Sequence, residues 1–215
     1  MVTEIKKIID ISVALGAGSI DYPGDTPYAS TSSCSLKKKD PYNLTGLAMS
    51  AHSGTHLDFP SHFLKNGRNI DGFPLSDFIL DAVVADMGGR ESIKPEDAGR
   101  ITAPPGGAIL FKTLNSRTGR SANGKFYKNF VYMTGEAALV CADKKVKLVG
   151  IDYITLDRYG EAGFPAHAAL MNKNILILEG LNLRSVRPGF YRLVCFPLKL
   201  KSVEAAPVRA VLVKE

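Results

Sequence analysis

The amino-acid sequence predicts a mixed α/β (α+β) fold: a single domain over residues 1–215 with a mixed β-sheet at its centre. Three observations carry this prediction. Short runs rich in β-branched residues recur along the chain, and Gly, Pro, Asn and Asp separate them. Helical patterns are few and short, which favours sheet with some helices rather than a helix bundle. No stretch has the composition of a linker, and 215 residues are enough for one substantial core.

The N-terminal part is predicted to consist of strands and turns. Residues 6–13 are rich in isoleucine and valine, which is typical of a strand. Residues 16–27 contain Gly, Pro and Asp without a helical period, so a loop is expected there. Two further strands are expected at residues 28–36 and 44–51, and the second leads to a histidine-rich segment.

The rest of the chain alternates between strands and short helices. Strands are expected at residues 80–87, 108–112, 147–152, 175–178, 190–200 and 207–213. Helices are expected to begin near residue 94 and to span residues 134–143 and 166–172. Residues 113–129 are polar and rich in Gly, Ser, Asn and Arg, which predicts a long exposed loop. Long loops in compact domains are often functional.

Composition narrows the class of protein. Apolar residues make up 45% of the chain and charged residues 22%, as in an ordinary globular protein, and no apolar run is long enough for a membrane span. The N-terminus does not resemble a secretory signal. Three widely spaced cysteines do not form a disulfide framework, so a cytoplasmic protein is expected. The net charge is +6, but its cations are scattered, so we expect neither a nucleic-acid nor a membrane partner.

The strongest chemical signal is residues 52–62, His-Ser-Gly-Thr-His-Leu-Asp-Phe-Pro-Ser-His, which hold three of the four histidines. Asp58 lies between the second and third of them. Neutral imidazole is the commonest nitrogen ligand of transition metals, and carboxylates are common oxygen ligands. One histidine beside a strand is more often structural than a ligand, but this clustering with an acid predicts a metal site.

A helical zinc-protease arrangement does not fit this segment. His52 and His56 are four residues apart, and on a helix they would share one face, as in the His-Glu-x-x-His motif. Gly54 and the β-branched Thr55 lie between them, and Pro60 follows. These residues disfavour a helix, so an extended segment is expected.

An extended segment places His52, His56, Asp58 and His62 on one side, because side chains alternate along a strand. Four extended residues span about 13 Å, which is too far for His52 and His56 to bind one ion. The chain must therefore bend between them, and Gly54 is where it can do so.

Three ligands leave a metal site incomplete, and two residues downstream can complete it. His167 is the remaining histidine, and Glu179 closes the apolar run at residues 175–178. A buried carboxylate without a partner is very costly, and a cation would satisfy it. With His52, His56 and Asp58 this makes five ligands, enough for one ion or for two ions that share a carboxylate. Nitrogen and oxygen ligands suit zinc, manganese or iron.

Hydrolysis by metal-activated water is the chemistry that this set favours. The chain has no Gly-x-Ser-x-Gly elbow, which argues against a serine hydrolase. His62 lies beyond Pro60, six residues after His56, where it can move protons without binding metal. A cyclase or dehydratase that uses the ions as Lewis acids is an alternative, and so is a non-catalytic metal-binding protein.

At these residues the sequence resembles the metal-dependent cyclase/kynurenine formamidase family, which includes bacterial arylformamidases. The family motif is His-x-Gly-Thr-His-x-Asp-x-Pro-x-His, and residues 52–62 match every specified position. The resemblance extends over nearly the whole chain. It includes the aromatic-Pro-Gly-Asp loop at residues 22–27, residues 149–157, His167, Glu179, and residues 196–200 and 206–211.

The resemblance implies a single-domain β/β/α fold, a small-molecule substrate, and assembly as a homodimer or homotetramer. It implies one metal held by His52, His56 and Asp58, and a second held by His167 with Asp58 and Glu179 shared. Zinc is the expected metal, with manganese as the alternative. His62 is implied as the general acid/base.

The implied reaction is arylformamidase chemistry: hydrolysis of N-formyl-L-kynurenine to kynurenine and formate, in tryptophan catabolism. The same family includes isatin-type cyclic-amide hydrolases, so cyclic amides and lactones are alternative substrates. Tyr22, an expected substrate-binding residue, stands where bacterial kynurenine formamidases typically have Trp. Ala166 and Ala168 flank His167, where those enzymes often have a second histidine.

Overall fold

The computed structural model describes residues 7–214. Residue 6, where the first predicted strand begins, lies outside the described residues. Most of the N-terminal stretch that was compared with a secretory signal lies outside them too. The strands are β1 (Lys7–Asp10), β2 (Ala29–Cys34), β3 (Leu44–Ala48), β4 (His56–Asp58), β5 (Ile79–Asp86), β6 (Ser92–Ile93), β7 (Ala108–Lys112), β8 (Tyr132–Met133), β9 (Leu148–Ile151), β10 (Leu176–Glu179), β11 (Gly189–Val194), β12 (Ala205–Pro207) and β13 (Val211–Lys214). The α-helices are α1 (Pro95–Gly99), α2 (Leu114–Arg117), α3 (Gly135–Asp143) and α4 (Pro165–Met171).

The predicted central mixed sheet is confirmed. Among the described residues, nine strands form one sheet in the order β1-β13-β11-β5-β7-β9-β10-β4-β12. Strands β5, β7, β9 and β10 are parallel neighbours, and antiparallel strands flank them on both sides. The sheet is curled, because β12 and β13 are three residues apart in the chain yet lie near opposite ends of the strand order.

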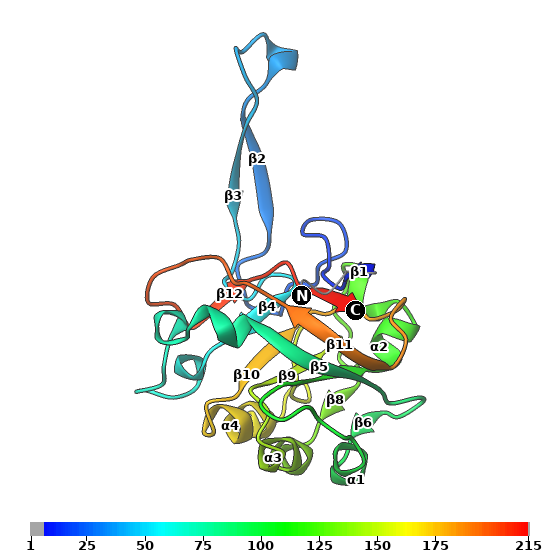
Figure 1. The fold of residues 1–215 in the computed structure, drawn as a ribbon. Helices are drawn as coiled ribbons and strands as arrows, with labels where there is room; N and C mark the ends of the chain where they lie inside the picture. Colours follow the sequence, from blue (N-terminus) through cyan, green and yellow to red (C-terminus); the bar gives the residue numbers. More distant parts are fainter. Residues whose placement is uncertain (1–6, 215) are drawn as a thin grey trace, which may run out of the picture.

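Side-chain alternation divides the core between the two faces of this sheet. On β7, Leu110 belongs to one buried cluster, enclosed by the curled strands, whereas Ile109 belongs to the other. Residues of α1, α3 and α4 pack into the second cluster, so helices cover that face, as Figure 1 shows. The arrangement is therefore strands on one side of the sheet and helices on the other.

Local signals explain the helices that were predicted. Thr134 caps α3 by accepting a hydrogen bond from the Ala137 backbone N–H at 3.2 Å. α4 begins at Pro165, a residue favoured in the first helical turn because it lacks the N–H that would be unsatisfied there. None of the helices in residues 7–214 is long and apolar enough to cross a membrane.

Two predicted strands do not join the sheet. β2 and β3 pair only with each other, and together with their connecting turn they form an exposed hairpin, here called the arm, over residues 29–48. The arm extends well away from the body of the molecule in Figure 1. Its strand residues are exposed or half-buried, so no apolar face directs it into the core.

The expectation of one long exposed loop over residues 113–129 was wrong. α2 and a 3₁₀ turn at Arg120–Ala122 lie within it, and Ser116 is buried. The buried carboxylate of Asp152 holds the start of this segment: it accepts hydrogen bonds from the backbone and hydroxyl of Thr113 and from the backbone of Ser116. Polar composition concealed the helix because its polar side chains are satisfied internally.

The two C-terminal strands were predicted too long. β11 ends at Val194, shortly before Pro197, because proline cannot donate a ladder hydrogen bond. The run predicted at 207–213 is divided between β12 and β13. Cys141 and Cys195 are fully buried, as expected of small apolar residues, and burial raises the pKa of each thiol to about 12.

Candidate metal centre

A bend before β4 brings the first histidine back to the strand. Gly54 has a φ of 65°, in the left-handed region that glycine adopts without strain. Thr55 fixes the bend: its hydroxyl donates to the Gly180 carbonyl at 2.6 Å and accepts from the Val13 backbone N–H at 2.9 Å. The predicted bend at Gly54 is thus confirmed, and it returns His52 to the side of the strand that carries His56 and Asp58.

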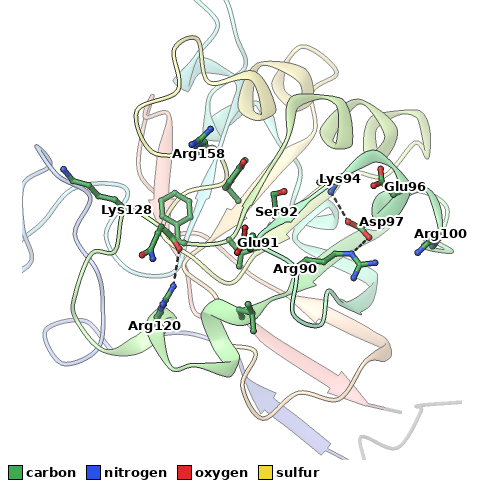
Figure 2. A pocket seen from close by; sticks show the side chains of 15 residues that line it. Arg90, Glu91, Ser92, Lys94, Glu96, Asp97, Arg100, Arg120, Lys128 and Arg158 are labelled. Atoms are coloured by element: carbon green, nitrogen blue, oxygen red, sulfur yellow. Dashed lines mark hydrogen bonds and ion pairs between the residues drawn. The ribbon is translucent and has the colours of Figure 1, made fainter.

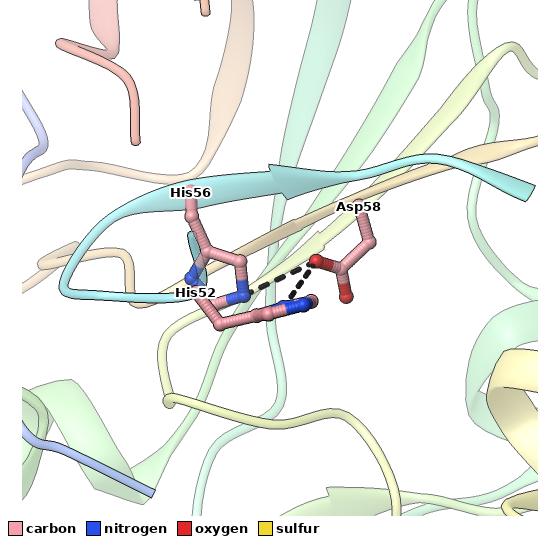
Figure 3. Close-up of side chains that lie close together, drawn as sticks. All are labelled: His52, His56 and Asp58. Carbon is pink, nitrogen blue, oxygen red and sulfur yellow. Dashed lines mark ion pairs between the residues drawn. The ribbon is translucent and has the colours of Figure 1, made fainter. Parts of the chain in front are cut away.

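Three side chains meet at the start of β4. His52 Nδ1 lies 2.9 Å and His56 Nε2 lies 3.3 Å from the same oxygen, Oδ1 of Asp58. Figure 3 shows the two imidazole rings facing this carboxylate. The arrangement follows from the sequence: residues 56 and 58 share one face of the strand, and the bend supplies the third group.

The second group comes from β10 and α4. β10 pairs antiparallel with β4 and places Glu179 directly opposite His56, so both side chains are on the helix-covered face. His167 Nε2 lies 3.5 Å from Oδ2 of Asp58 and 3.2 Å from Oε1 of Glu179. His52, His56 and Asp58 form one potential metal-binding group, and Asp58, His167 and Glu179 form another.

Four buried atoms in these groups fit a cation because, apart from their contacts with one another and with His52 and His167, they have no hydrogen-bond partner among the described residues. His56 Nε2, both carboxylate oxygens of Asp58 and Oε1 of Glu179 make no hydrogen bond to any described residue. Such atoms are rarely left unsatisfied, because each costs the free energy of its lost hydration. The short distances between these atoms are those of metal ligands arranged around a common point, and a divalent metal ion there would satisfy all four.

The electrostatics also favour a positive charge here. Asp58 is fully buried, and although burial alone would raise the pKa of its carboxyl, His56 and His52 hold that pKa well below its usual range. Burial alone would lower the pKa of His56, but Asp58 and Glu179 raise it to about 10. The carboxylates thus draw protons onto the histidines in this pocket, and a bound cation would take the place of those protons.

In His56 and His167, Nδ1 donates to a fixed acceptor, so Nε2 is free to bind a metal ion. His56 Nδ1 donates to the Gly54 carbonyl at 3.0 Å. His167 Nδ1 donates to Asp157 Oδ2 at 2.5 Å. Because both partners can only accept, the proton of each neutral ring lies on Nδ1 and the lone pair on Nε2 points to the centre.

Asp157 is the functional residue that the sequence analysis missed. Besides His167 Nδ1, it accepts from the backbone N–H groups of Ala166 at 2.7 Å and His167 at 3.1 Å, and so it also caps α4. It is fully buried. Two sequence signals pointed to it: the resemblance over residues 149–157, which ends at Asp157, and a carboxylate eight residues before a helix that begins with Pro165 and carries a histidine.

His62 lies beside the donor groups, on the 3₁₀ turn Pro60–His62 that follows β4. Its ring centre is 4.2 Å from that of His52 and 6.1 Å from that of His167. Burial, and then the neighbouring histidines His52 and His167, lower its pKa, while Asp58 and Glu179 oppose them. The structure thus brings all of the predicted histidines together, and their individual roles stay predictions.

A cavity of about 280 Å³ opens onto these groups. Phe63, Ile154 and Phe164 give it apolar walls, and Tyr22, Asp25 and Thr155 line it as well. The ring of Tyr22 packs 5.5 Å from that of Phe126, so the 113–129 segment supports this wall of the cavity. A small apolar cavity over a few convergent polar groups is typical of a small-molecule site.

A larger cavity, of about 1000 Å³, lies elsewhere (Figure 2). Charged side chains of both signs surround it, and Arg90 forms an ion pair with Asp97 there. None of the described residues that line it is a histidine or cysteine. The described residues that line the larger cavity thus provide no set of metal-binding side chains like that in the smaller one. The smaller cavity is therefore the candidate functional site.

Comparison with known proteins gives independent evidence on the family of this chain. The sequence profile of the family described as "Putative cyclase" matches residues 9–158. A kynurenine formamidase of Salinibacter ruber is 35% identical over 207 residues, which cover 95% of this chain and 96% of the relative. A predicted metal-dependent hydrolase of Bacillus stearothermophilus has a similar structure, with a TM-score of 0.83, 29% identity, and coverage of 97% of this chain and 98% of the other.

A more distant structure has the same fold. Isatin hydrolase A of Labrenzia aggregata is 22% identical, with a TM-score of 0.79 and coverage of 96% of this chain and 93% of the other. The comparisons confirm the resemblance that residues 52–62 predicted.

Asp157→Asn should weaken metal binding. The amide keeps the shape but can no longer act as a carboxylate toward His167 Nδ1, so the orientation and basicity of that ring decline. We expect a 10- to 100-fold loss of affinity, the usual effect of removing such a partner. Competition with a chromogenic chelator measures this affinity.

Asp152→Asn is the matched control: that buried carboxylate holds α2, so its loss should lower stability and leave metal affinity within about twofold. Equal metal affinity in wild type and Asp157→Asn would contradict the role assigned to Asp157.

Proposed function

The chain belongs to the cyclase family, and we propose that it is a metal-dependent hydrolase of C–N amide bonds that acts on aryl formamides. N-formyl-L-kynurenine is the leading substrate, with kynurenine and formate as products. The observation that supports this most is the set of unpaired buried donor atoms at the floor of an apolar cavity, with His62 beside them.

His52, His56 and Asp58 would hold one ion, and Asp58, His167 and Glu179 would hold a second or complete the sphere of the first. We propose zinc, with manganese as the alternative, since nitrogen and carboxylate ligands suit both. When bound, the metal lowers the pKa of water toward 7 and polarises the carbonyl of the substrate.

The chain's own residues perform the remaining tasks. Phe63, Ile154 and Phe164 exclude bulk water and provide a surface for an aryl ring, and Tyr22 closes the wall against Phe126. The His62 imidazole takes a proton from the attacking water and gives it to the leaving aryl amine nitrogen. One water is consumed, the C–N bond breaks, and formate leaves.

Formate release from N-formyl-L-kynurenine tests the substrate assignment. We expect turnover by the zinc- or manganese-loaded protein, because every group that the reaction requires lines one cavity. Asp58→Ala should reduce it to background, because Asp58 contributes to both donor groups. Wild-type turnover no greater than that of Asp58→Ala would rule out N-formyl-L-kynurenine as the substrate.

A panel of cyclic amides and lactones then separates hydrolysis from cyclase or dehydratase chemistry. The masses of the products decide, because hydrolysis adds one water.

His62→Ala should separate catalysis from metal binding. Because we place His62 in proton transfer rather than among the ligands, the variant should retain its metal and lose roughly 10²–10⁴ in rate. Elemental analysis and the formate assay on the same preparation give both values. Loss of the metal would make His62 a ligand, and an unchanged rate would contradict its role in proton transfer.

We also propose that the chain assembles as a homodimer or homotetramer through the arm. Leu44 and Leu47 of β3 are 50% and 60% exposed, and Leu36 and Tyr42 at the end of the arm are exposed too. A lone two-stranded hairpin is marginally stable in water, so these apolar side chains favour contact with a second copy.

Sedimentation measurements on a variant with Leu44→Ser and Leu47→Ser test this assembly. We expect the wild type at twice the monomer mass or more and the variant at the monomer mass. Leu139→Ser is the control, because Leu139 is similarly exposed, at 49%, but lies on α3. A wild type that is monomeric at micromolar concentration would refute the proposal.

A further inference from the structure

We propose that Asp25 forms a subsite for a substrate ammonium group in the metal-lined cavity. This inference rests on the proposed hydrolase function and adds to it a specificity-determining residue, one that selects aryl formamides with a positively charged amino group. N-formyl-L-kynurenine, with its α-ammonium group, belongs to this class.

A tight turn holds Asp25 against the cavity. The Asp25 backbone N–H donates to the Tyr22 carbonyl at 3.0 Å, so residues 22–25 form a β-turn. Pro23 fits the second position of this turn, and Gly24, with a φ of 104°, fits the third. Tyr22 and Asp25 therefore stand at the two ends of one rigid turn, and both side chains line the cavity.

Among the described residues, the carboxylate of Asp25 forms no ion pair with a Lys, Arg or His. Its side chain accepts a long hydrogen bond of 3.4 Å from the Ser50 hydroxyl. None of the described residues that line the cavity is Lys or Arg. The other two carboxylates there, Asp58 and Glu179, already face the histidines and the proposed metal. Asp25 is thus the lining carboxylate that is available to a ligand.

The arrangement selects a cation at one end of the substrate. With the formyl group at the donor atoms and the aryl ring against Phe63 and Ile154, an amino-bearing side chain can extend toward the Tyr22–Asp25 turn. An ammonium group there gains a charge-assisted hydrogen bond, whereas an analogue without it leaves the carboxylate unpaired. A purely anionic formamide would be repelled.

A structural role for Asp25 makes a different prediction. The Ser50 hydroxyl that donates to Asp25 also accepts from the His52 backbone N–H at 3.1 Å. Asp25 could thus act only by holding His52 in place. In that case its removal would impair every substrate equally, because it would act through the metal ligand rather than through the substrate.

Two substrates separate these roles. The first is N-formyl-L-kynurenine, and the second is the same molecule with hydrogen in place of the amino group. We expect Asp25→Asn to lower the ratio of their kcat/KM values by about tenfold or more, mainly through KM, the effect of one charge-assisted hydrogen bond. Asp21→Asn is the control: Asp21 lies in the same loop, accepts from the Tyr28 backbone and does not line the cavity, so the ratio should stay. Equal losses on both substrates would overturn the subsite.

Binding provides a measurement that does not need turnover. Calorimetry on the zinc-loaded proteins compares kynurenine with its analogue that lacks the amino group. Wild type should bind kynurenine about tenfold more tightly, and Asp25→Asn should lose this difference. If neither formamide is hydrolysed but the difference is seen, the proposed function fails and the subsite stands. If wild type binds both compounds equally, or neither, the subsite is overturned.

Discussion

Asp58 imposes the constraint on which the site depends. Its carboxylate is fully buried, both of its oxygens lack hydrogen bonds within the described residues, and three histidines from two distant parts of the chain face it. A buried anion without compensation would oppose folding. The fold meets this cost by building a place for a cation, and the curled sheet, the bend at Gly54 and the start of α4 all converge on it.

The positions of the other groups follow from strand pairing. β10 lies between β9 and β4, so the apolar run that builds the core ends with Glu179 opposite His56. α4 packs its apolar side on the same face, and Asp157 holds the first turn of that helix. The turn at residues 22–25 and the aromatic walls then enclose the space above the donor atoms. The strands and helices that build the core thus also position the site. The two potential metal-binding groups lie on the helix-covered face of the sheet.

Much of this could be predicted from residues close together in the chain. The spacing of His52, His56 and Asp58, with Gly54 between the histidines, was sufficient to predict an extended segment with a bend. Glu179 ends a buried strand, so it was likewise possible to predict that its charge needs a partner. The resemblance added the division of the five ligands between two ions and the activity class, and comparison with known proteins bears out the family.

What could not be predicted depends on contacts between distant segments. The two strands at residues 29–48 could be predicted, but their pairing only with each other depends on tertiary packing that the local pattern does not reveal. The helix within residues 113–129 exists because Asp152, more than thirty residues away in sequence, accepts its N–H groups. The role of Asp157 likewise appears only when α4 is seen to lie against it.

Metal stoichiometry tests the central claim most directly. The account states that the unpaired atoms around Asp58 are the ligands of a divalent ion. Protein stripped with a chelator, dialysed against excess zinc and then against metal-free buffer, should retain one or two ions per chain by elemental analysis. Retention no greater than that of an unrelated protein treated in the same way would contradict the account.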